Sequence, residues 1–116
     1  MTFAVRFWGV RGSIACPSPQ HVEYGGNTSC LEIVTTNDRI ILDAGTGLRE
    51  LGDERVARGE KEAIVLLSHT HWDHINGFPF FAPIYDPAAK VRVLAGHVRD
   101  AGGIRSVFER QFASPV

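Results

Sequence analysis

Ser68-His69-Thr70-His71-Trp72-Asp73-His74 follows directly on the apolar run Ala63-Ile64-Val65-Leu66-Leu67, and these two stretches decide the fold and the site that the sequence predicts. A short apolar run that contains β-branched residues is typical of a central strand covered on both faces. The next segment places three imidazoles and a carboxylate within a few residues. Because a strand that ends in such a loop presents these groups at a sheet edge, the pattern predicts a metal site there.

Further strands are expected from apolar alternation or short apolar runs, and they cover residues 3–8, 28–36, 39–43 and 91–95. Asn37-Asp38 is predicted to form a two-residue turn between the second and third of these strands. Residues 9–27 are rich in Gly and Pro, which predicts a long loop.

A helix is expected over residues 48–58, with Leu48, Leu51 and Val56 facing inward and Gly59 ending it. A short helix or turn is expected over residues 75–83. A final amphipathic helix is indicated by apolar residues spaced to lie on one face, namely Ile104, Val107, Phe108 and Phe112. Strands that alternate with helices favour an α/β layered sheet.

Length and composition predict one globular domain that covers residues 1–116. Apolar residues make up 44% of the chain, charged residues 22%, and the net charge is −1, so no broad nucleic-acid-binding surface is expected. No secretory signal or membrane-spanning run is visible. Cys16 and Cys30 are expected to be free thiols, which favours a cytoplasmic location.

The spacing of the four polar residues suggests two metal ions. In an extended loop, residues two apart point the same way, so His69 and His71 are expected to hold one ion. Asp73 and His74 are expected to turn back toward the same pocket and hold a second ion. Imidazole nitrogen favours zinc, and the added carboxylate also allows manganese or iron. The other histidines, His21 and His97, are interpreted as loop or surface residues.

The loop resembles the H-x-H-x-D-H signature of the metallo-β-lactamase superfamily, and the resemblance extends over essentially the whole chain. Asp43-Ala44-Gly45 is similar to the turn that precedes the first helix in that family. Three further segments are similar to a branch near the phosphodiesterase and ribonuclease Z-like members, namely Arg11-Gly12-Ser13, residues 24–30 and residues 77–81.

This resemblance implies roles for individual residues. His69 and His71 would be ligands of the first metal, and Asp73 and His74 ligands of the second. Asp73 would also orient the attacking hydroxide, which makes it the candidate catalytic residue. Asp43 would accept a hydrogen bond from a ligand histidine and so steer its ring. No substrate-binding residue is assigned. Asn27 and Thr28 are interpreted as turn residues of a glycine-rich segment, with a position facing the pocket as the alternative.

The fold that the resemblance implies is an αβ/βα four-layer sandwich of two similar halves, and this chain corresponds to the N-terminal half. The family's remaining ligands come from the second half, and His97, Asp86 and Asp100 do not stand in a similar context. We therefore expect the second half to be absent from the chain. A half-fold would expose an apolar sheet face, for which Phe3, Val34, Ile41 and Leu66 are candidates. The chain is expected to need its own C-terminal half or a second chain, for example in a homodimer.

The resemblance implies a metal-dependent hydrolase that cleaves phosphodiester bonds with a hydroxide activated between two metal ions. Its substrate would be a small molecule or a nucleotide. One alternative is a hydrolase of β-lactams, thioesters or other esters on the same fold. Another is a metal-binding fragment or interaction module without turnover, because four ligands in one loop are enough to hold a single ion.

Overall fold

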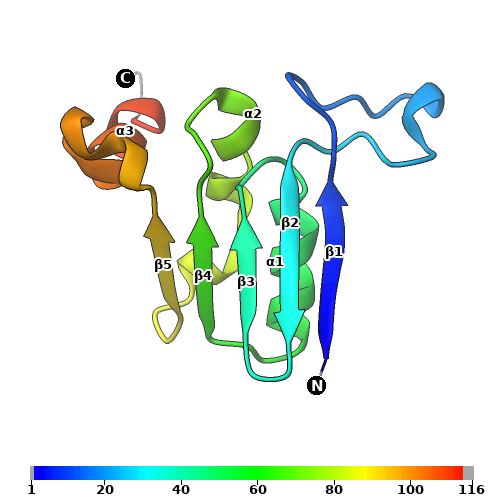
Figure 1. The fold of residues 1–116 in the computed structure, drawn as a ribbon, viewed down its shortest axis with the longest axis horizontal. Helices are drawn as coiled ribbons and strands as arrows, with labels where there is room; N and C mark the ends of the chain where they lie inside the picture. Colours follow the sequence, from blue (N-terminus) through cyan, green and yellow to red (C-terminus); the bar gives the residue numbers. More distant parts are fainter. Residues whose placement is uncertain (1, 114–116) are drawn as a thin grey trace.

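The computed structural model describes residues 2–113, which form a five-stranded mixed sheet with helices on one face (Figure 1). The strands lie in the order β1 (Phe3–Gly9), β2 (Cys30–Thr35), β3 (Arg39–Leu42), β4 (Glu62–Leu66) and β5 (Lys90–Leu94). The expected α/β class is confirmed. Met1 and Val116, the two ends of the predicted domain, lie outside the described residues.

The strand directions bring most loops to one edge of the sheet. β1, β2 and β3 form an antiparallel meander, whereas β3, β4 and β5 are parallel. As a result, β1, β3, β4 and β5 end at the same edge, and β2 begins there (Figure 1). We call this edge the carboxyl edge. The ends of parallel strands are where α/β sheets usually carry their ligands.

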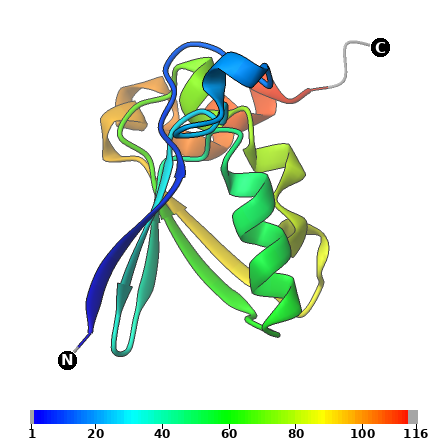
Figure 2. The same cartoon turned by 90° about the vertical axis from the view of Figure 1, so that its right-hand side faces the viewer.

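The helices connect these strands. The helix α1 (Leu48–Ala57) joins β3 to β4 and packs on one face of the sheet (Figure 2). Between β4 and β5 the chain forms α2 (Trp72–Ile75) and the 3-10 helices η2 (Phe78–Phe80) and η3 (Ala82–Tyr85). After β5 come η4 (Gly96–Ala101) and α3 (Gly103–Gln111), and η1 (Pro19–His21) lies in the long loop after β1. Within the part of the chain that the structure describes, no helix has the length and apolar character needed to cross a membrane.

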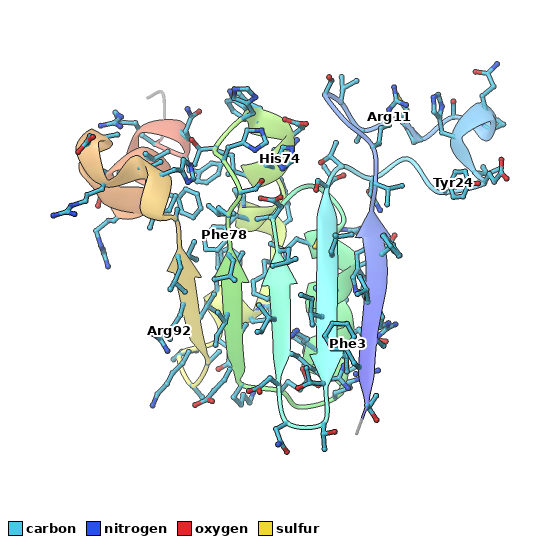
Figure 3. All side chains as sticks on the ribbon, in the orientation of Figure 1. Phe3, Arg11, Tyr24, His74, Phe78 and Arg92 are labelled. Atoms are coloured by element: carbon cyan, nitrogen blue, oxygen red, sulfur yellow. The ribbon has the colours of Figure 1, made fainter. Side chains whose placement is uncertain are left out.

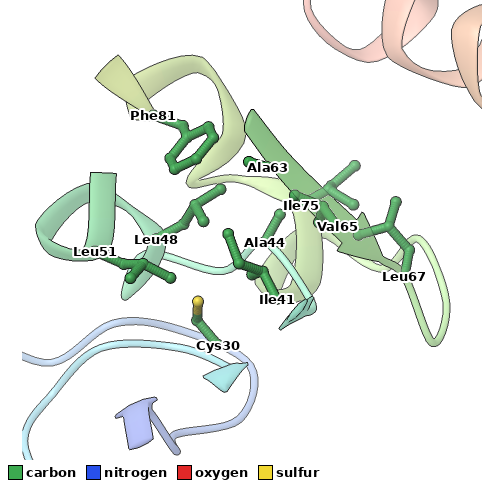
Figure 4. Close-up of a cluster of buried hydrophobic side chains, with 10 residues drawn as sticks. All are labelled: Cys30, Ile41, Ala44, Leu48, Leu51, Ala63, Val65, Leu67, Ile75 and Phe81. Carbon is green, nitrogen blue, oxygen red and sulfur yellow. The ribbon is translucent and has the colours of Figure 1, made fainter. Parts of the chain in front are cut away.

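The core lies between the sheet and its helices (Figure 4). Ile41 of β3 and Val65 of β4 are fully buried, as are Leu48 and Leu51 of α1. Phe81, which lies between η2 and η3, is also fully buried and closes this core. The two predicted inward leucines of α1 are therefore confirmed.

The prediction that Val56 is the third inward residue of α1 is wrong. Val56 is 55% exposed, and its neighbour Arg55 is only 2% exposed. Nη2 of Arg55 lies 3.2 Å from Oε2 of Glu32, and Nη1 donates to the carbonyl of Glu62 over 3.1 Å. Because Glu32 is fully buried on the helix-covered face of β2, it needs a cation close by, and the helix presents Arg55 instead of Val56.

The opposite face of the sheet carries no helix, and we call it the open face. Strand register places two rows of side chains across it: Val5, Ile33, Ile40, Ile64 and Arg92, and then Phe7, Leu31, Leu42, Leu66 and Leu94. Phe3 and Phe7 are each 70% exposed. Figure 3 labels Phe3 and Arg92 at the two ends of this face.

The open face corrects three expectations. The strand β4 is covered on one face only, because Ile64 and Leu66 point to the open face and remain half-buried. Phe3 and Leu66 lie on the open face as predicted. Val34 and Ile41 do not, because they alternate with open-face residues along their strands and so point toward the helices.

The hairpin between β2 and β3 turns one residue earlier than predicted. The N–H of Thr35 donates to the carbonyl of Asp38 over 2.8 Å, so the turn residues are Thr36 and Asn37. Oγ1 of Thr35 accepts from the N–H groups of Asn37 and Asp38 at 3.3 and 2.9 Å. These side-chain hydrogen bonds stabilise the turn in place of a glycine.

Candidate metal centre

The His/Asp loop leaves β4 at the carboxyl edge. The N–H of Leu67 still pairs with the carbonyl of Leu94 at 2.9 Å, so the sheet holds the chain up to the residue before Ser68. His71 is the residue directly before α2, and Asp73 and His74 lie within that helix. Figure 3 shows His74 at this edge, where the loop after β1 also carries Arg11.

The structure brings the four predicted ligand side chains together. The ring of His69 lies 4.6 Å from that of His71 and 4.0 Å from that of His74, measured between centroids. Nε2 of His74 lies 3.4 Å from Oδ2 of Asp73. His71 is exposed, while Asp73 and His74 are half-buried. The spacing of this loop therefore produces one continuous patch of nitrogen and carboxylate donors.

The rings contact one another, and within residues 2–113 no three His, Cys, Asp or Glu side chains surround a common point that could hold an ion. The chemistry of the donor set nevertheless fits a divalent metal, because three imidazoles and a carboxylate are typical ligands of zinc, manganese or iron. A further observation supports this fit. Nδ1 of His74 is buried without a hydrogen-bond partner, yet lies 3.0 Å from Oδ2 of Asp43. A carboxylate behind an imidazole is the usual support of a metal-ligating histidine.

Asp43 is held at the end of β3 by its backbone. Its φ is 65°, and its N–H donates to the carbonyl of Leu66 over 2.8 Å. Its carboxylate is almost buried and accepts from both the backbone N–H and the hydroxyl of Ser68. These contacts place it behind the ligand loop and beside His74. Its steering of a ligand histidine stays a prediction, and the contact with Ser68 had no counterpart in the sequence reasoning.

The short helix α2 is fixed by the turn that follows Asp43. The N–H of Ala44 donates to the carbonyl of His74 over 2.8 Å, and the N–H of Gly77 donates to the carbonyl of Ala44 over 2.9 Å. A Cβ atom at Gly77 would lie 1.9 Å from the carbonyl oxygen of Gly45, and one at Gly45 would lie 2.5 Å from that of Asp73. The two glycines thus allow the backbone contacts that position Asp73 and His74.

The loop after β1 reaches the site through Ser13. Its backbone N–H donates to Oδ2 of Asp73 over 3.0 Å, and its φ is 70°. This N–H is the main reason why the pKa of Asp73 lies below its ordinary value, and the neighbouring His74 and His69 lower it further, whereas burial raises it. Ser13 belongs to a segment that resembles one branch of the family, but no role was predicted for it, because a backbone donor leaves no signal in the side-chain pattern.

Asn27, Thr28 and His21 make contacts outside the ligand patch. Thr28 is fully buried, and the backbone N–H groups of Thr28 and Thr46 each donate to the other's hydroxyl over 2.8 Å. Asn27 accepts from the same Thr46 hydroxyl at 3.1 Å, so Asn27 and Thr28 join loops, as expected of turn residues. His21 contacts Ser18 over 2.6 Å in η1.

The remaining His and Asp residues that follow His74 do not join the ligand patch. His97 and Asp100 are exposed on η4, and the surface interpretation of His97 is confirmed. Asp86 pairs with Lys61 over 2.6 Å before β5 begins, at the opposite edge of the sheet.

Comparison with known proteins identifies the family of this chain. The family model described as the metallo-beta-lactamase superfamily matches residues 24–110, which include the ligand loop. No curated protein matches the sequence. One solved structure, provisionally described as a metallo-beta-lactamase from Thermotoga maritima, is 17% identical with a TM-score of 0.48. The match covers 85% of this chain and 45% of that one. The chain belongs to the metallo-beta-lactamase superfamily, whose members are mostly metal-dependent hydrolases.

Proposed function

We propose that the chain supplies the metal ligands that the N-terminal half of the fold contributes to a two-metal hydrolase site. We also propose that this site cleaves phosphodiester bonds. The observation that carries the proposal is that His69, His71, Asp73 and His74 lie side by side at the carboxyl edge, on the loop after β4 and the start of α2. His69 and His71 would hold one ion, and Asp73 and His74 a second, most simply zinc. Bound ions would lower the pKa of a water and neutralise charge on the phosphate.

The protein's own residues define what Asp73 can do. Its lowered pKa keeps the carboxylate ionised, which makes it a good ligand and hydrogen-bond acceptor but a weak base. We therefore propose that Asp73 orients the attacking water and does not act as the general base that accepts the proton of that water. The preference for phosphodiesters rests on the likeness of the segments around Ser13, residues 24–30 and residues 77–81 to one branch of the superfamily. The contact of Ser13 with Asp73 supports a place for the first of them beside the reacting groups.

The test is a comparison of substrates under defined metal loading. The protein is supplied with zinc or manganese, and hydrolysis of bis-p-nitrophenyl phosphate is compared with that of nitrocefin and a thioester. The proposal expects phosphodiester turnover that exceeds the other two and disappears with a chelator. With two ions bound, a lack of phosphodiester turnover would refute it. Turnover of nitrocefin or of the thioester instead would show that the site hydrolyses β-lactams or thioesters.

A metal-binding module without turnover is the second candidate, and one observation favours it. Within the described residues, the four predicted ligands do not surround a common point that could hold an ion. Tight binding of one ion without hydrolysis of any of the three substrates would support this second function.

We further propose that the open face is covered in the working protein, by a second half of the fold or by a second copy of this chain. The support is the row from Phe7 to Leu94, which is apolar on all five strands and is exposed at both ends, beside a second row that is apolar except for Arg92. Exposed apolar surface of this extent favours association. Sedimentation of the 116-residue chain as a stable monomer that binds no hydrophobic dye would contradict this proposal.

A further inference from the structure

Ser68 links the buried carboxylate of Asp43 to the first ligand histidine. Its hydroxyl oxygen lies 2.7 Å from Oδ2 and 2.9 Å from Oδ1 of Asp43. The same oxygen lies 3.0 Å from Nδ1 of His69. The backbone N–H of Ser68 also donates to Oδ1 of Asp43 over 2.8 Å, which fixes the residue against the carboxylate.

The direction of these hydrogen bonds follows from a count of protons. A serine hydroxyl has one hydrogen, and an ionised carboxylate can only accept. If the hydroxyl donated to His69, its lone pairs would face both oxygens of Asp43 at 2.7 and 2.9 Å, which is repulsive. The hydroxyl therefore donates to Asp43, and its oxygen accepts from Nδ1 of His69.

This direction sets the tautomer of the neutral His69 ring. With the hydrogen on Nδ1, the lone pair lies on Nε2, which is then the nitrogen free to bind a metal. His74 differs, because its Nδ1 lies 3.0 Å from Oδ2 of Asp43 but makes no hydrogen bond with it, so no tautomer is assigned to this ring. One buried carboxylate thus lies behind two ligand rings, close to His74 and linked to His69 through the hydroxyl of Ser68.

We infer that Ser68 is a positioning residue, whose hydroxyl transmits the acceptor strength of Asp43 to His69 and presents Nε2 of that ring as the ligand atom. The part of this inference that concerns metal affinity rests on the proposed function. The part that concerns the tautomer does not, because it describes the protein without metal.

The first arm of the test reads the tautomer directly. Two-bond ¹H–¹⁵N correlation spectra of the metal-free protein at pH 8, where an ordinary imidazole is neutral, distinguish Nδ1–H from Nε2–H for each ring. The wild type is expected to show Nδ1–H at His69, Ser68→Ala to lose that preference, and Ser68→Thr to keep it. An Nε2–H ring at His69 in the wild type would overturn the inference, even if no variant folded.

The second arm measures zinc affinity by competition with a chelating dye. Ser68→Ala is expected to weaken binding about 10- to 100-fold, the range typical of lost support behind a metal ligand, and Ser68→Thr to restore most of it. The matched control is Ser18→Ala, which removes a similar hydroxyl contact from His21 and should alter only that ring. Unchanged zinc affinity in Ser68→Ala, with the wild type binding zinc, would overturn the positioning role. A wild type that binds no zinc would refute the proposed function and leave the tautomer result to decide for or against Ser68.

Discussion

The backbone N–H of Ser13 lies 3.0 Å from Oδ2 of Asp73, and this hydrogen bond joins the loop after β1 to the ligand loop after β4. It is the main cause of the lowered pKa of Asp73. Because the contact comes from the backbone, it requires a residue that has an N–H and tolerates a φ of 70°. The Ser13 side chain itself is not needed for it.

This hydrogen bond predicts that two substitutions at Ser13 affect zinc affinity differently. Ser13→Pro removes the N–H and cannot adopt a positive φ, so Asp73 loses its donor and zinc affinity should fall by roughly tenfold or more. Ser13→Gly keeps the N–H and favours the observed φ, so zinc affinity and thermal stability should match or slightly exceed the wild type. Calorimetric zinc titration of both variants measures this, and equal affinities of the two would contradict it.

Gly77 should be intolerant of a side chain. The Cβ of Gly77→Ala would lie 1.9 Å from the carbonyl oxygen of Gly45, and neither backbone can yield without moving α2. We expect destabilisation of about 3 kcal/mol or more, at the upper end for overpacking, together with weaker zinc binding. Urea unfolding gives the free energy. Gly96→Ala is the control, because no atom lies within 4 Å of its added Cβ, and an equal loss in both variants would exclude this explanation.

The buried Glu32–Arg55 pair should matter for stability and not for metal binding. Glu32→Ala removes the nearer carboxylate from the buried guanidinium of Arg55 and leaves Glu60 at 3.4 Å as its remaining partner, which should cost about 3 kcal/mol of unfolding free energy, the lower end for a broken buried pair. Asp53→Ala, on the exposed side of α1, should change stability by less than about 0.5 kcal/mol. Chemical denaturation of the two variants tests this, and a loss below about 1 kcal/mol for Glu32→Ala would show that the pair is dispensable.

The raised pKa of the buried Cys30 thiol predicts that the folded protein loses stability in alkaline solution. Burial, with the nearby charges of Glu32 and Asp43, raises the pKa of this thiol from 9.0 to about 12. Above pH 9 the unfolded chain releases this proton while the folded protein keeps it, so the Cys30 contribution falls by about 1.4 kcal/mol per pH unit up to the folded pKa. Unfolding at several pH values, compared with Cys30→Ala, isolates this slope. Parallel pH profiles of the two proteins would contradict it.

Much of the fold was predictable because local patterns and tertiary contacts agree. Alternation located β1 and β2, and the apolar run identified β4. The ligand loop was predictable because metal chemistry requires specific side chains at short spacing. The inward residue at the end of α1 was not, because periodicity favours Val56 and only the tertiary neighbour Glu32 explains why Arg55 turns inward.

The supporting contacts of the site were less accessible to sequence reasoning. Ser68 stood inside the quoted motif, but its function depends on the distance to Asp43, which strand pairing sets across β3 and β4. The prediction also placed Val34 and Ile41 on the wrong face of their strands. Alternation gives two faces of a strand, and only the position of α1 shows which one is covered.

The central claim is that the loop after β4 binds divalent metal through its histidines. The most direct measurement is the zinc content of the purified protein and of His69→Ala/His71→Ala after equilibration with equal free zinc and gel filtration. His21→Ala/His97→Ala serves as the matched control, because it removes two histidines outside the ligand patch. We predict that the wild type and the control retain zinc and that the loop variant loses most of it. Equal zinc retention by all three proteins, or by none, would contradict the claim.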